Sequence, residues 1–361
     1  MAEAPVSESA IYSARPTVRL DTRAYPLISE LILGMRMTES EGGLSSLELR
    51  LSNWVNDTDG GANLAFEDGA LVKLGAALTI YAGDELAPQE IFSGTITALE
   101  ADFPRAAAPE LVVLAEDALQ QLRLARRTKT YKDRTVAEII RQIVREAGLT
   151  ATVDGFDDNP STQVQLNESD LAFIRRLLAR ADGDLQVVGR ELHVAARGAV
   201  QRSQLTLRLG GQLREARVLA DLAQQVTQIT AGGWDVRQGR PISARSSGAT
   251  SGPGRGRNGA EALREALGAR SLHLGHLAAA NQTELQALAD AAFDQRARRF
   301  VCVEGTAEGN PQLRVGSHLT LEGLGPRFSN TYYVTRVCHR YDLEHGYETD
   351  FEAECAFLGE G

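Results

Sequence analysis

The stretch ESDLAFIRRLLARADG, residues 168–183, predicts a short amphipathic helix that organises the middle of the chain. Apolar residues recur along it at helical spacing, so that one face carries Leu171, Ile174, Leu178 and Ala181. Phe173 and Leu177 flank this face, whereas three arginines point elsewhere. We therefore expect the helix to pack its apolar face against a neighbouring layer.

Both ends of this helix carry capping signals. Ser169 or Asn167 can accept a hydrogen bond from the free N–H groups of the first turn, and Asp170 suits the positive end of the helix dipole. Gly183 is well placed as the left-handed residue that ends the helix. The stretch is therefore predicted to be one docked helix, and its purpose depends on the rest of the chain.

The segment DRTVAEIIRQIVREAGL, residues 133–149, predicts the clearest helix. Thr135 and Glu138 form a T-x-x-E capping box, and Gly148 ends the run. Turn residues follow at Gly155 and at Asn159-Pro160, and the short strand patterns LQVVG and ELHVAA come after the second helix. Together these elements predict a small α/β domain over residues 129–199.

The N-terminal part of the chain favours short strands. TVRLDTR and SSLELRLSN alternate apolar and polar residues, as half-buried strands do. Residues 75–103 predict two strands joined by a loop near Pro88. Several short strands within about a hundred residues suggest a small barrel or sandwich, which we place at residues 1–128 as a first β-barrel domain.

Strand patterns return in the C-terminal part. We expect a second, discontinuous β-barrel domain formed by residues 200–241 and 300–361. The segment 242–259 is rich in Ser, Gly and Arg and predicts a flexible loop. A helix follows in NQTELQALADAAFDQRARRF, with Thr283 as its cap, so residues 242–299 form an insertion. The predicted fold class is α+β, mainly β.

Composition limits the function classes. The chain has 361 residues, a formal net charge of −10, and only 6% aromatic residues, which argues against a nucleic-acid binder. The basic stretch over residues 122–134 is interpreted as a solvated connection. The start, MAEAPVSESA, lacks the features of a secretory signal, and no apolar run is long enough to cross a bilayer. We therefore expect a cytoplasmic product without membrane insertion.

Searches for catalytic, cofactor and metal motifs give no site. The G-x-G-x-x-G at Gly254, Gly256 and Gly259 has no buried strand leading into it, so a dinucleotide site is not expected. Cys338 and His339 are adjacent in a strand, where their side chains point to opposite faces.

The remaining candidates are equally weak as chemical sites. His273 and His276 are three residues apart but have no carboxylate nearby. The pair Asp57-x-Asp59 lacks the other features of a calcium loop. The three cysteines, Cys302, Cys338 and Cys355, are too dispersed for a disulfide framework or a zinc cage and are interpreted as reduced strand residues. No catalytic residue, cofactor or metal is therefore predicted.

With its elements in this order, the chain resembles the phage late control protein D family, the hub proteins of contractile tails, which share their fold with the N-terminal half of VgrG. The resemblance is carried by Glu168, Ser169 and Asp170 with the helix after them, by KDRTVAEIIRQIV, and by YYVTRVCHRYDLEHGYETDFEA near the C-terminus. Segments LGAALTIYAGD and IFSGTITALEADF also look like the first barrel of that family.

This resemblance implies a structural role. Two similar barrels per subunit would form a homotrimeric ring of six, which adapts a three-fold spike to a six-fold inner tube. Implied partners are a separate spike protein, since the chain stops after its last hub strand, inner tube or tube-initiator proteins, and baseplate wedge proteins. The product would assemble in the cytoplasm into a particle of a phage, an extracellular system or a type VI system. Alternatives are a tail-associated cell-wall hydrolase and a generic soluble adaptor.

Candidate contact residues lie in GPRFSNTYYV. Phe328, Tyr332 and Tyr333 are aromatic residues next to a turn, and interface anchors favour aromatic side chains. The alternative is that these three residues belong to the core of the second barrel.

Overall fold

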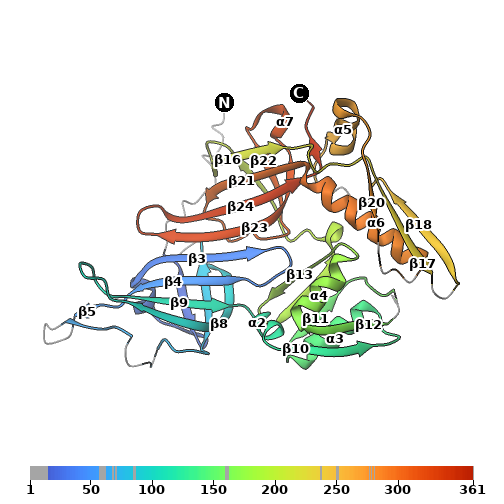
Figure 1. Cartoon of the computed structure of the whole chain (residues 1–361). Coiled ribbons are helices and arrows are strands. Elements are labelled where there is room, and N and C mark those ends of the chain that lie inside the picture. Colours follow the sequence, from blue (N-terminus) through green and yellow to red (C-terminus); the bar gives the residue numbers. More distant parts are fainter. Residues whose placement is uncertain are drawn as a thin grey trace.

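The computed structural model describes residues 15–56, 62–66, 69, 71–83, 87–158, 162–235, 238–248, 252–275, 277, 279 and 281–360. Its largest element is one sheet of thirteen strands that includes both halves of the chain (Figure 1). The N-terminal half contributes β1 (Thr17–Leu20), β2 (Arg23–Ala24), β3 (Ile32–Ser40), β4 (Ser46–Ser52), β7 (Ala77–Ala82), β8 (Gln89–Asp102) and β9 (Glu110–Glu116). The C-terminal half contributes β15 (Gln204–Arg208), β16 (Leu213–Ala220), β21 (Val301–Glu308), β22 (His318–Glu322), β23 (Thr331–Asp342) and β24 (Gly346–Cys355).

The predicted alternation explains why these segments form strands with a buried face. In β4 every second residue is buried, and these residues are Leu47, Leu49 and Leu51. Their side chains belong to an apolar core made by the N-terminal strands, whereas a second core lies under the C-terminal strands. Each half of the sheet therefore covers its own core.

The two halves are joined edge to edge. Strand β23 pairs antiparallel with β3, from Arg336 opposite Ser40 to Asp342 opposite Gly34. Tyr341 of this strand packs in the N-terminal core, and Val337 packs in the C-terminal one. The junction is thus continuous in both backbone pairing and side-chain packing.

Both halves repeat one strand pattern. The order of neighbouring strands is the same in the two halves. In the N-terminal half it is β3, β4, β9, β8 and β7, and in the C-terminal half the corresponding strands are β16, β21, β24, β23 and β22. The registers also agree, because β8 and β23 each carry an irregularity at a threonine, Thr97 and Thr335. Gly75 and Gly316 both adopt φ +83 and donate their N–H groups to Ile96 and Val334. The halves differ at the end of the sheet, since β1 pairs antiparallel with β7 whereas β15 pairs parallel with β22.

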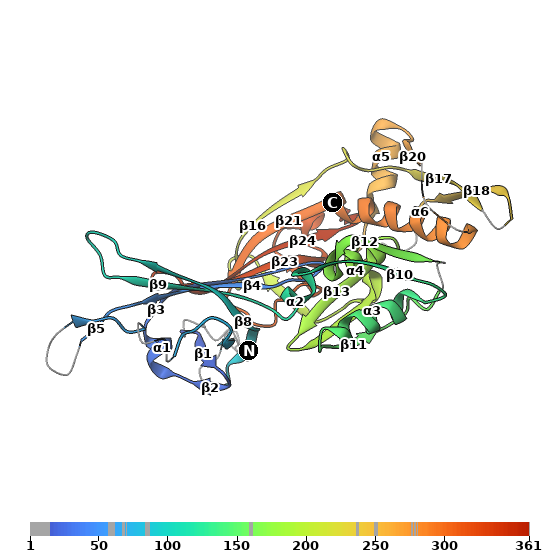
Figure 2. The ribbon, with the colours of Figure 1, turned by 60° about the horizontal axis from the view of Figure 1, so that its bottom comes forward.

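A small α/β unit lies beside the sheet (Figures 1 and 2). It contains α2 (Gln120–Arg123), β10 (Arg126–Tyr131), α3 (Val136–Glu146), β11 (Thr150–Val153), β12 (Gln163–Ser169), α4 (Asp170–Ala179), β13 (Gly183–Val188), β14 (Glu191–Ala196) and the short helix η1 (Arg197–Ala199). The predicted capping box of α3 is confirmed, because Thr135 and Glu138 exchange hydrogen bonds with each other's backbone. The apolar side chains of α3 and α4 share one core with the adjacent strands.

The quoted helix is confirmed, with one correction at its end. Ser169 caps α4 by accepting a hydrogen bond from the N–H of Ala172 at 3.2 Å. The left-handed residue after the helix is Asp182, at φ 49, and not Gly183. Gly183 begins β13, where an added Cβ would lie 2.7 Å from the ring of Phe156, so close packing requires this glycine.

A third unit is inserted between β16 and β21. Strands β17 (Gln228–Asp235), β18 (Arg240–Ser246) and β20 (Ser271–Leu274) form a separate sheet that packs against α6. The other elements here are β19 (Arg257–Asn258), α5 (Gly259–Leu267), α6 (Gln282–Ala297) and η2 (Arg298–Phe300). Short elements elsewhere are α1 (Pro26–Glu30), β5 (Val55–Asn56), β6 (Ala62–Asn63), α7 (Gly325–Phe328) and β25 (Phe357–Leu358).

Several predicted boundaries are wrong. The stretch 226–241 does not join the second β domain, because β17 pairs with β18 and β20. The predicted loop over 242–259 begins inside β18, contains β19, which pairs with β25, and ends at the first residue of α5. The predicted boundary at residue 128 falls inside strand β10. The core of the α/β unit already includes Leu119, so this unit begins about ten residues earlier than predicted.

Two local expectations also fail. The predicted solvated connection over 122–134 contains β10, which pairs with β12. Asn281, and not Thr283, caps α6 by accepting a hydrogen bond from the N–H of Glu284 at 2.9 Å. Four features discussed from the sequence lie outside the described residues: the start of the chain, the pair Asp57 and Asp59, the turn Asn159-Pro160, and His276. None of the helices in the described ranges combines the length and apolar composition that a bilayer crossing requires.

Candidate functional site: open sheet edges and a charged sheet face

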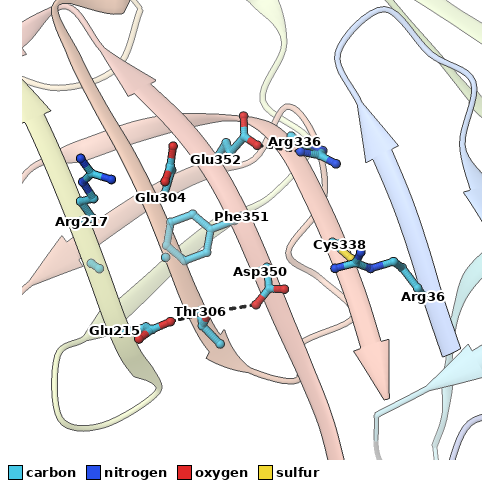
Figure 3. Close-up of a pocket in the computed structure, with 12 residues that line it drawn as sticks. Arg36, Glu215, Arg217, Glu304, Thr306, Arg336, Cys338, Asp350, Phe351 and Glu352 are labelled. Atoms are coloured by element: carbon cyan, nitrogen blue, oxygen red, sulfur yellow. Dashed lines mark hydrogen bonds and ion pairs between the residues drawn. The ribbon is translucent and has the colours of Figure 1, made fainter. Parts of the chain in front are cut away.

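One face of the large sheet is charged where its halves meet (Figure 3). Strands β16, β21, β24, β23 and β3 together line a hollow of about 430 Å³ on it. Its charged residues are Arg36, Arg217, Arg336, Glu215, Glu304, Asp350 and Glu352. Arg336 and Glu352 form an ion pair of 2.9 Å in which both side chains are about half exposed. The face is therefore a hydrated surface of mixed charge.

A buried ion network joins the units of the chain. Arg197, at the end of the α/β unit, is 4% exposed and pairs with Glu41 after β3 and Glu354 of β24. Arg298 of η2 pairs with the same Glu354 at 3.2 Å and with Asp182 after α4 at 2.6 Å. Burial raises the pKa of Glu354, and the two guanidinium groups oppose this rise. The network holds three structural units in one arrangement.

A neighbouring network fixes the end of β3. Glu39 is buried and pairs with Arg314 at 2.7 Å, and Gln186 of β13 donates a hydrogen bond to the same carboxylate. Arg202 pairs with the buried Asp184 at 2.7 Å. Because charges taken out of water need such partners, these contacts specify how the α/β unit meets the sheet.

The described residues with strongly shifted pKa values are enclosed in the core. Burial, and then the charge of Arg314, lower the pKa of His339 to about 3, and its Nδ1 lies 2.8 Å from the Tyr347 hydroxyl. Burial raises the pKa of Asp117 to about 6, although the N–H groups of Ser45 and Leu119 oppose this rise. Since both groups are buried and held by hydrogen bonds within the fold, both are best explained as structural.

The predicted contact residues separate into two kinds. Tyr332 and Tyr333 are fully buried, so their expected role as interface anchors is wrong and the core interpretation holds. The Tyr332 hydroxyl donates to the backbone oxygen of Phe328 at 2.7 Å, and the Tyr333 ring lies 3.7 Å below the guanidinium of Arg197. Phe328 is half-buried, and its contact role stays a prediction.

The remaining motif residues show no converging chemistry. Cys338 lines the charged hollow whereas His339 points into the core, as the strand pattern predicts. Gly254 and Gly256 adopt positive φ in a tightly packed connection that leads to α5. His273 lies in β20, and its Nδ1 lies 3.0 Å from the Thr230 hydroxyl. Among the described residues, no three His, Cys, Asp or Glu side chains gather closely enough to hold a metal ion.

Two long edges of the large sheet are open in the described part of the chain. Strand β16 ends the sheet: its first residue, Leu213, also bridges to Leu209, and β21 is the one described strand that pairs along the rest of β16. Strand β8 pairs with β7 only as far as Thr95, so its edge from Thr97 onward meets no described strand on that side. Leu99, Phe103 and Leu219 at these edges are 37%, 60% and 59% exposed. Local sequence patterns do not indicate these edges, because the edges become apparent only when the two halves of the chain are aligned with each other.

Comparison with known structures defines the class of fold. The 43 kDa tail protein of prophage MuSo2 from Shewanella oneidensis superposes with a TM-score of 0.70 at 12% identity over 94% of this chain and 97% of its own. A tail protein from Neisseria meningitidis gives 0.64 at 9% identity, covering 94% of this chain and 96% of its own. The predicted resemblance to phage tail and hub proteins is thus confirmed for the fold.

A third structure extends this class to secretion systems. A component of the type VI secretion system of E. coli, itself described as similar to the T4 tail proteins gp27 and gp5, gives 0.57 at 14% identity over 95% of this chain and 79% of its own. The family model of the Alg8 N-terminal domain matches residues 55–342. The chain belongs to that family. Comparison with curated proteins finds no matching sequence.

Proposed function

We propose that this chain is a structural hub in the baseplate of a contractile injection system or phage-like tail. In this proposal it forms a homotrimer that adapts a three-fold central spike to a six-fold inner tube. The observation that carries the proposal is the repeated strand pattern, because the two halves are joined edge to edge through β3 and β23. Three copies joined in the same way present six similar sheets.

The two repeats are proposed as barrel-type tube domains. The first consists of the strands from β1 to β9, and the second consists of β15 and β16 with the strands from β21 to β24. The α/β unit and the α6 unit lie at one end of the molecule in both views (Figures 1 and 2). We propose that these two units face outward and meet baseplate wedge proteins.

A structural role agrees with the chemistry of the site. The charged face of the sheet carries hydrated ion pairs, and the strongly shifted pKa values described above belong to core residues. His339 and Asp117 are buried, so these two groups do not reach a substrate as general acid–base catalysis would require. The proposed partners are therefore proteins: the spike, the inner tube or its initiator, and further copies of this chain in a particle assembled inside the producing cell.

Light scattering of the purified protein tests this function. The hub predicts a particle of three times 39.0 kDa for the protein alone, or a heavier three-to-three complex when the spike protein is added in equal amount. A mass of one copy at every concentration, with no shift on adding the spike, contradicts the proposal. A trimer that also binds the spike supports it.

A further inference from the structure

We propose that the open edge of β8 pairs antiparallel with the open edge of β16 in a second copy of this chain, with Ala101 opposite Val218. This inference rests on the proposed ring-forming function and specifies the contact that closes the ring. Exposed sheet edges present unpaired N–H and C=O groups, which a strand of another molecule can satisfy. The two edges are open in the described part of the chain, as shown above.

The register follows from the internal repeat. The irregularity at Thr335 in β23 matches that at Thr97 in β8, so Arg336 corresponds to Ala98. The irregularities near the starts of β3 and β16, after Ile32 and Leu213, align these two strands in the same way.

The junction inside the chain therefore provides the template. There, His339 of β23 lies opposite Met37 of β3. The corresponding residues in β8 and β16 are Ala101 and Val218. Once these two residues are placed opposite each other, the partner of every other residue in the two strands is fixed.

Side chains that meet in this register match in character. On the face that continues the two apolar cores, Leu99 meets Ala220, Ala101 meets Val218, and Phe103 meets Ala216. Leu99 lies opposite the buried Val113 of β9, and Val218 lies opposite the buried Val303 of β21, which identifies this face as the core face. Pairing would therefore cover the exposed apolar surface of Leu99 and Phe103.

On the charged face one pair is complementary, whereas its neighbour places Glu100 opposite Leu219. Asp102 of β8 comes opposite Arg217 of β16 in this register, and opposite charges on directly paired strand residues stabilise the pair. At the template junction the corresponding residues are Arg340 and Arg36, and Arg340 is neutralised there by Asp350 at 3.0 Å. The intermolecular contact thus has its own complementary charges.

Charge also opposes the alternative pairing of two β8 edges. A two-fold axis through that edge would bring the acidic residues Glu100 and Asp102 of one copy next to those of the other, which is unfavourable. Pairing of β8 with β16 is instead a head-to-tail contact, and such contacts form closed rings when the rotation between subunits permits closure. The second copy is therefore the occupant that both edges fit.

Engineered disulfides test the register. In a Cys302→Ser background, which removes a half-buried thiol opposite Leu219, the variant Ala101→Cys with Val218→Cys should form covalent oligomers under mild oxidation. The matched control is Ala101→Cys with Ala220→Cys, whose positions lie on one diagonal at about 7–8 Å, beyond the reach of a disulfide. We expect at least tenfold more interchain product from the first pair.

Charge exchange provides a second test on exposed positions. Asp102→Arg should reduce self-association, measured as mass by light scattering, and Asp102→Arg with Arg217→Asp should restore it. A trimer in which the control disulfide forms as well as the first, or in which the exchange restores nothing, overturns the register while the hub function stands. A protein that stays monomeric without any cross-link overturns both.

Discussion

Arg197 supplies the sharpest test of how the units are held together. Its guanidinium contacts Glu41 and Glu354 and stacks on Tyr333 at 3.7 Å. Removing one partner of a buried ion pair costs about 3–5 kcal/mol because a buried charge is left behind. Arg298 still reaches Glu354 at 3.2 Å, so we expect Arg197→Met to lower the free energy of unfolding by about 3 kcal/mol, at the lower end of that range.

A matched control exists on the surface. Arg208 and Glu322 form an exposed pair of 2.9 Å with side chains 72% and 43% exposed, and such pairs contribute about 0–1 kcal/mol. Both variants, Arg197→Met and Arg208→Met, are measured by urea unfolding with circular dichroism. A second variant, Glu354→Gln combined with Arg197→Met, should recover part of the loss because it removes the buried charge. Equal stabilities of the two single variants would refute the assigned role of the network.

Three further predictions follow from individual residues. Burial raises the pKa of Asp117 to about 6, so between pH 4 and pH 6 the folded state retains this proton while the unfolded chain loses it. The free energy of unfolding should therefore fall by about 2 kcal/mol between pH 4 and pH 7, and Asp117→Asn should remove this contribution in urea titrations. Thr135→Ala removes the cap of α3 and should cost about 1 kcal/mol in unfolding free energy, and no change in the urea midpoint would contradict the capping argument. Gly94→Ala would place a Cβ 2.3 Å from the backbone oxygen of Glu116, so we expect a loss of about 1–3 kcal/mol, whereas Gly69→Ala, which meets nothing within 4 Å but has φ +61, should cost less in the same assay.

The sequence predicted local elements better than their partners. The T-x-x-E pattern before α3 and the alternation in β4 are short-range signals, and both are confirmed. Strand β10 was missed because ARRTKTY is charged and its pairing with β12 depends on tertiary context. Strand β17 was predicted as a strand but in the wrong sheet, and most of β18 was predicted as a loop, because the sheet they form depends on packing against α6.

The junction between the halves required a comparison that local patterns do not provide. Strands β3 and β23 lie about 300 residues apart in the chain, so nothing near either one indicates its partner. A signal did exist in GAALTI at residues 75–80 and GSHLTL at residues 316–321, which occupy corresponding places in β7 and β22. Tyr332 and Tyr333 illustrate the opposite error, since aromatic residues near a turn belong to a core as readily as to an interface.

The ring is the central claim, and end-on images of the purified protein by negative-stain electron microscopy test it most directly. The account predicts closed rings of three copies in which six similar sheets surround a channel. It also predicts that Asp102→Arg disperses the rings and that adding Arg217→Asp restores them. Single compact particles, or rings built from a number of copies other than three, would contradict it.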